Sequence, residues 1–197
     1  MAHRAPPNAG VERGRRTYGF TLIELLAVLA LVGIMISIVT PLFNPGRWRA
    51  DSAVQEVMVG LNAAQRLAVL RQHDVVVTFL VDERELLVHR DADNDGDVDS
   101  GEDIRVIELP EAMGFSRGSA PPIDGESDDI SFASVGGEPR VVFHRNGSAS
   151  EAGTAYLRPL EGSMATDVEA SRAVSVERST GQVRCYSYRT GSWEGSC

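Results

Sequence analysis

The chain has 197 residues, 43% of them hydrophobic, which suits one globular domain of modest size together with an apolar segment. The formal net charge is -9, and this acidic balance disfavours nucleic-acid binding as the main function. The chain also lacks a glycine-rich phosphate loop and a Gly-x-Ser-x-Gly motif, so we expect no enzymatic activity.

An arginine-rich tail, residues 1–19, precedes an apolar run. The uncharged residues 25–43 would form a helix about 28 Å long, close to the thickness of the hydrocarbon core. We therefore predict an anchor helix over residues 20–43, with the arginines cytoplasmic and the rest exported. Glu24 is costly there, because a charge at the bilayer centre costs about 3 kcal/mol or more. The alternative interpretation is an ordinary signal anchor with an incidental glutamate.

The stretch Gly19-Phe20-Thr21-Leu22-Ile23-Glu24 resembles the processing site of type IV prepilins and type II secretion pseudopilins. The resemblance implies that a prepilin peptidase cuts after Gly19 and methylates the new N-terminus at Phe20. It also implies that Glu24 pairs with the N-terminal amine of a neighbouring subunit. Removal of this leader, which holds four arginines and one glutamate, would leave 15 basic and 27 acidic residues, a net charge of -12.

A second helix is predicted over residues 51–72. Pro41 matches the frequent helix proline of the pilins, and Asn44-Pro45-Gly46 predicts a bend or a short non-helical link. Ser52 and Gln55 form a capping box at the expected start of the helix. Apolar residues then recur at three- and four-residue spacing, a stripe expected to pack on a sheet: Val54, Val57, Met58, Leu61, Ala64, Leu67 and Ala68.

The pattern then changes to β-strands. Residues 75–81 are β-branched and apolar, and a turn at 82–84 returns the chain as a hairpin partner, 85–90. Further strands are predicted over residues 104–109, 130–133, 140–145, 153–159, 173–178 and 182–188, and a surface loop over 117–129. This order predicts an α+β fold for residues 44–197, in which an amphipathic helix packs on antiparallel β-sheets.

Two later segments extend the resemblance. Residues 142–148 with 153–157, and the hairpin 173–184, resemble the H-type minor pseudopilins of the GspH/FimT group. The resemblance implies a type IV pilin-like fold and a structural subunit near the tip of the periplasmic pseudopilus of type II secretion, which supports protein secretion across the outer membrane. The implied partners are other pseudopilins or pilins, the prepilin peptidase and the bacterial inner membrane, with secreted proteins as candidate cargo.

The alternative is a FimT-like minor type IV pilin that serves pilus biogenesis or DNA binding and uptake. DNA binding requires clustered arginines, and the family's Gly-Arg-x-Arg turn here reads Gly181-Gln182-Val183-Arg184, with one arginine missing. A small patch of Arg172, Arg178, Arg184 and Arg189 could still form. The net charge of the mature chain opposes such binding, because the phosphate backbone dominates nucleic-acid affinity.

The acidic stretch 91–102 matches the pattern of a calcium loop. The predicted oxygen donors are Asp91, Asp93, Asp95, Asp97, Asp99 and Glu102, and Gly96 permits the sharp turn. Six carboxylates in twelve residues repel one another unless a hard cation neutralises them, and oxygen donors favour Ca²⁺. The flanking segments are predicted strands, so we expect a structural ion. The alternative is a solvated acidic hairpin tip.

Two cysteines, Cys185 and Cys197, lie near the C-terminus. Because the domain is expected outside the cytoplasm, where disulfides persist, a bridge between them is the favoured interpretation, with two free thiols as the alternative. The histidines are scattered and have no metal-ligand spacing. His89 adjoins the acidic stretch and is predicted to be a residue on a strand face.

Overall fold

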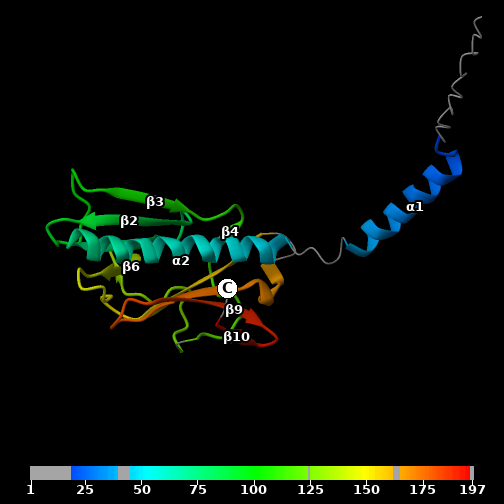
Figure 1. The fold of residues 1–197 in the computed structure, drawn as a ribbon. Helices are drawn as coiled ribbons and strands as arrows, with labels where there is room; N and C mark the ends of the chain where they lie inside the picture. Colours follow the sequence, from blue (N-terminus) through cyan, green and yellow to red (C-terminus); the bar gives the residue numbers. More distant parts are fainter. Residues whose placement is uncertain (1–18, 40–44, 124, 162–164, 196–197) are drawn as a thin grey trace, which may run out of the picture. The chain divides into compact units, whose positions relative to one another are not determined.

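The computed structural model describes residues 19–39, 45–123, 125–161 and 165–195 (Figure 1), and its contacts divide the chain into two units, Met1–Phe43 and Asn44–Cys197. The first unit contains helix α1 (Leu22–Val39), whose start is capped by the Thr21 hydroxyl, which accepts a hydrogen bond from the amide of Glu24. Within the described residues, no helix has both the length and the apolarity needed to cross a membrane. Most of the predicted leader, and Pro41, lie outside the described residues.

Helix α2 (Pro45–Arg71) begins earlier than predicted. Proline suits the first helical turn because its φ is already helical and its missing N–H would have no partner there. The Pro45-Gly46 pair therefore starts the helix, although it was expected to break one, and residues 40–44 lie outside the description. The predicted capping box is wrong, since Ser52 and Gln55 lie inside α2 with exposed side chains.

The remaining elements form two antiparallel sheets, which confirms the α+β prediction. The first sheet has the order β3-β2-β1-β6-β5 and the second has the order β10-β9-β8-β7-β4. The strands of the first sheet are β1 (Asp74–Leu80), β2 (Glu85–Asp91), β3 (Ile104–Glu108), β5 (Ser134–Val135) and β6 (Glu138–Phe143). Those of the second are β4 (Met113–Phe115), β7 (Gly153–Pro159), β8 (Arg172–Val176), β9 (Val183–Arg189) and β10 (Ser192–Glu194), with the short 3₁₀ helix η3 (Val168–Ala170) before β8.

The strand predicted over residues 130–133 does not form. Ile130 makes a single isolated bridge to Ala155, and the amide of Thr154 donates to the hydroxyl of Ser131 (2.8 Å) where a ladder would use a backbone carbonyl. Ile130 and Phe132 are nevertheless buried, so their apolar character reflects core packing in a loop. The short strands β4, β5 and β10 were not predicted, because two or three residues cannot show an alternating pattern.

One core joins α2 to both sheets. Figure 1 shows α2 running alongside strands of both sheets. The buried face of α2 consists of small and branched residues: Ala50, Ala53, Val54, Val57, Leu61, Ala64 and Ala68. Phe79 of β1 packs against the rings of Phe115 and Phe132, at centroid distances of 5.6 and 5.4 Å. Every member of this core lies between residues 50 and 185, so the unit Asn44–Cys197 holds a complete core and can fold by itself.

Ion pairs fasten the first turns of α2 to η3 and β8. The Arg172 side chain is 1% exposed; its Nε donates to Asp51 (2.6 Å), and its Nη1 donates to the backbone carbonyl of Glu169 (2.9 Å). Arg47 donates to the carboxylates of Asp167 (3.2 Å) and Glu169 (2.7 Å). The buried charge of Arg172 is thus matched by a carboxylate and a carbonyl oxygen.

At its other end, α2 is bound to two hairpin turns. The side-chain amide of Gln65 donates to the carbonyl of Gly147 (2.9 Å) and to that of Thr180 (2.7 Å). Gly181 has a φ of +62°, and a Cβ there would lie 2.3 Å from the Gly147 carbonyl oxygen. Both the backbone conformation and the close approach therefore require glycine at this position.

Gly181→Ala is expected to lower the free energy of unfolding by about 3 kcal/mol, because a left-handed conformation and a backbone clash add together. Gly191→Ala is the matched control: its φ is +85°, but nothing lies within 4 Å of the added Cβ. It should cost only about 1 kcal/mol. Urea unfolding of residues 44–197 measures both values, and equal losses would contradict the close contact.

Candidate functional site

The acidic loop connects β2 to β3, and its first carboxylate is buried. Asp91 ends β2 and is 3% exposed. The amides of Asp95 and Gly96 donate to its two carboxylate oxygens, at 3.1 and 2.9 Å. Gly96 has a φ of +82°, which confirms its predicted role in the sharp turn. The turn folds back onto the side chain of Asp91, and the two amide donors stabilise its negative charge.

Three of the six predicted donors come together. Carboxylate oxygens of Asp91, Asp93 and Asp95 lie within 4.8 Å of one another. Asp91 is buried and the other two are exposed, so the group opens to solvent on one side. Such a set of hard oxygen donors has the chemistry that Ca²⁺ requires, and this donor set fits the ion predicted from the sequence.

Glu102 closes the loop through backbone hydrogen bonds, and its role as a metal ligand stays a prediction. Its two oxygens accept hydrogen bonds from the amides of Ala92 (2.7 Å) and Asp99 (3.1 Å), which closes the loop on itself. These bonds hold the pKa of Glu102 below its ordinary value. Asp97, Asp99 and Glu102 do not join the three clustered aspartates. The pKa of Asp99 is raised, chiefly by the negative charges of Asp95 and Asp93.

A cation from another strand holds the loop. Nη1 of Arg140, on β6, donates to the carbonyl of Gly96 (2.9 Å), and its Nη2 donates to the carbonyl of Val135 (3.3 Å). The alternation of side chains places Arg140 on the sheet face that points away from α2, together with His89 of β2. The loop is thus fixed to this outer face by a partner 44 residues away in the sequence.

His89 lies on the same face and is 1% exposed. Neither ring nitrogen has a hydrogen-bond partner among the described residues. Burial lowers the pKa of His89, while the nearby carboxylates of Glu102 and Asp91 raise it to a smaller extent. The sequence identified His89 as a strand residue, but no local pattern indicated its burial or the contact between Arg140 and the loop.

The other predicted site residues are spread over the chain. Gly19 and Phe20 are exposed, and Glu24 is exposed in the first turn of α1. Cys185 is half-buried on β9 and is disulfide-bonded. Cys197, the partner predicted for it, lies outside the described residues.

The arginine patch considered for DNA binding loses one member. Arg172 is buried and paired with Asp51, so it cannot contribute to a surface that contacts phosphates. The guanidinium of Arg184 donates a hydrogen bond from Nη2 to the side-chain oxygen of Gln182 (2.9 Å), and Arg184 remains exposed. The prediction that Arg172 belongs to a surface patch is therefore wrong, because a buried arginine needs its carboxylate partner.

Comparison with known proteins gives two family matches. The model of the prokaryotic N-terminal methylation motif matches residues 14–40, and that of the type II transport protein GspH matches residues 53–181. Two solved structures of the minor pseudopilin EpsH from the type II secretion system of Vibrio cholerae are similar to the chain. One has 16% identity and a TM-score of 0.48 over 71% of this chain and 97% of that chain. The other has 20% identity and a TM-score of 0.46 over 71% and 94%. No curated protein matches the chain.

In the metal-free loop, Asp99 should titrate above its ordinary pKa of 3.8 and Glu102 below its ordinary 4.5. Loop closure by Glu102 is then fully present above pH 4.5 and is lost as the pH falls through the lowered pKa of that group. Carboxyl ¹³C NMR titration of residues 44–197 measures both pKa values. In the double variant Asp93→Asn/Asp95→Asn the pKa of Asp99 should fall; no change there would contradict the repulsion.

Proposed function

This chain belongs to the GspH family of type II transport proteins, and from that premise we propose that it acts as a minor pseudopilin, a structural subunit of the periplasmic pseudopilus. The observation that carries this proposal is the order of two family matches in one chain. The methylation motif at residues 14–40 precedes the GspH domain at residues 53–181. Assembly with other pseudopilins is therefore its function, and the β-rich unit Asn44–Cys197 is the part available to partner subunits or secreted cargo.

The N-terminal segment supplies the assembly helix. The prepilin peptidase cuts after Gly19 and methylates Phe20, both of which are exposed and precede α1. The apolar sequence that includes α1 and continues to residue 43 anchors the subunit in the inner membrane before assembly. Glu24 then requires a cation in an apolar environment, and the N-terminal amine of the next subunit provides it.

A location outside the cytoplasm would also allow a disulfide near the C-terminus. Cys185 and Cys197 are the two cysteines of the chain, and in the periplasm a bridge between them persists. Such a bridge would fasten the last residues to β9, which is an inner strand of the second sheet. The loop-entropy model assigns about 3 kcal/mol to a closed loop of this size.

Glu24→Ala should leave cleavage after Gly19 intact and reduce incorporation into the pseudopilus by about tenfold or more, because loss of an ion pair in an apolar core removes more than about 1.4 kcal/mol. Quantitative immunoblotting of sheared pseudopili and of membranes measures incorporation and processing separately. Ser37→Ala on the same helix is the control and should incorporate normally. Normal incorporation of Glu24→Ala would contradict the role of the carboxylate.

The acidic loop is the second part of the proposal: it binds a structural Ca²⁺. The clustered oxygens of Asp91, Asp93 and Asp95 support this, because the donor set fits a hard cation. A divalent ion there would neutralise the mutual repulsion that raises the pKa of Asp99. The chain's own residues then keep the loop in place, through the bonds of Glu102 to two amides and of Arg140 to the Gly96 carbonyl.

Calcium at millimolar concentration should raise the melting temperature of residues 44–197 by about 5 °C, since binding to the folded state alone stabilises it. The variant Asp93→Asn/Asp95→Asn should lose the shift. The control Asp82→Asn/Asp128→Asn removes two carboxylates outside the loop and should keep it. Differential scanning calorimetry with Ca²⁺, Mg²⁺ and chelator measures the shifts, and the absence of a calcium shift in the unmodified unit would identify the loop as a solvated tip.

A further inference from the structure

The two sheets end in four edge strands, and one of them differs from the rest. β5, β4 and β10 have two or three residues each, whereas β3 has five. Very short edge strands protect a sheet from pairing with another chain. Three of the four edges have this protection, and β3 does not. Its sequence, Ile-Arg-Val-Ile-Glu, is rich in β-branched residues and contains no proline.

The backbone of β3 presents free hydrogen-bonding groups. β3 pairs with β2 in antiparallel register, and the bonds from Arg90 to Asp103 and from Leu109 to Arg84 fix which residues bond inward. By the alternation of an antiparallel ladder, residues 104, 106 and 108 point their N–H and C=O groups away from β2. Among the described residues, nothing pairs with these groups.

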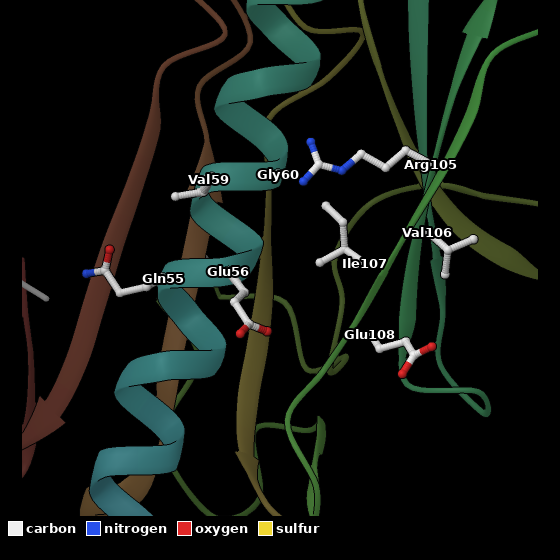
Figure 2. A pocket seen from close by; sticks show the side chains of 8 residues that line it. All are labelled: Gln55, Glu56, Val59, Gly60, Arg105, Val106, Ile107 and Glu108. Atoms are coloured by element: carbon white, nitrogen blue, oxygen red, sulfur yellow. The ribbon is translucent and has the colours of Figure 1, made fainter.

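The side chains of β3 divide between two faces. Figure 2 shows Arg105 and Ile107 pointing toward α2, where they line a groove of about 430 Å³ beside Val59 and Gly60. Ile104 and Val106 point to the other face and are 51% and 47% exposed. Apolar surface on both faces of an unpaired edge is unusual in a monomer, because it favours association.

We propose that β3 pairs with β3 of a second copy of this chain, in an antiparallel, two-fold symmetric contact. Centred on Val106, this register places Ile104 opposite Glu108 of the other copy and Arg105 opposite Ile107. The three outward residues of each strand then bond with one another, and the two first sheets become one continuous sheet.

The sequence of β3 favours a second copy of this chain as the partner at this edge. A two-fold contact places the same strand on both sides, so it must be compatible with itself. In this register no two like charges stand directly opposite, Val106 meets Val106, and the aliphatic stem of Arg105 covers Ile107. The two exposed branched side chains of each strand lose water at the same time. The contact uses the GspH domain alone and does not depend on α1 or Glu24.

The test is the mass of residues 44–197 by sedimentation equilibrium over a range of concentrations. The unmodified unit should approach twice the monomer mass. Val106→Lys places a charge at the centre of the contact and should weaken association by about a hundredfold or more. Val135→Lys is the matched control: Val135 is 50% exposed and lies on β5, the opposite edge of the same sheet. This control should dimerise as the unmodified unit does.

Amide hydrogen exchange supplies a readout that does not depend on a substitution. The amides of residues 104, 106 and 108 should become protected as the concentration rises, because only in the dimer do they have acceptors. A monomer at all concentrations, a Val106→Lys variant that still dimerises, or loss of dimerisation in Val135→Lys would each overturn the proposal. The last result would indicate head-to-tail pairing of β3 with β5.

Discussion

The burial of one face of α2 is the constraint on which the rest of the domain depends. Its inner face consists of alanine, valine and leucine, and these residues form one core with both sheets. The helix contacts strands of both sheets, and the ring of Phe79 on β1 meets that of Phe115 on β4, so helix and sheets bury their inner faces in the same core. The helix therefore fixes where both sheets lie, and with them the acidic loop and the edge strand β3.

The sequence predicted the parts of this arrangement that depend on local periodicity. The stripe on α2, the hairpin of β1 and β2, and strand β7 follow from spacings of three to four and of two residues. It did not predict the start of α2, because Pro45 and Gly46 usually interrupt a helix and here occupy its first turn. The loop at Ile130 resembled a strand because burial, and not pairing, determines its composition.

Only the clustered carboxylates of the candidate site were predictable from the sequence; the contacts that support the loop were not. The spacing of Asp91, Asp93 and Asp95 within one loop is local, so the sequence identified the three carboxylates that cluster. The support for the loop is not local: Arg140 reaches Gly96 across the sheet, and His89 is buried on the same face. Such contacts depend on strand order, which a single sequence does not reveal. The bonds of Glu102 to the amides of Ala92 and Asp99 do not follow from the loop pattern, because that pattern identifies Glu102 only as a metal ligand.

The ion pairs at the beginning of α2 have a mechanical consequence. Any force that reaches the unit Asn44–Cys197 through the preceding chain enters it at the first turns of α2. There Arg172 is joined to Asp51, and Arg47 to Asp167 and Glu169. These bonds cross from the helix to η3 and β8, so tension on the helix becomes shear between α2 and the second sheet. The charged clamp thus shares the load with the apolar face of α2, whose contacts separate more easily than short, directional bonds when elements slide past one another.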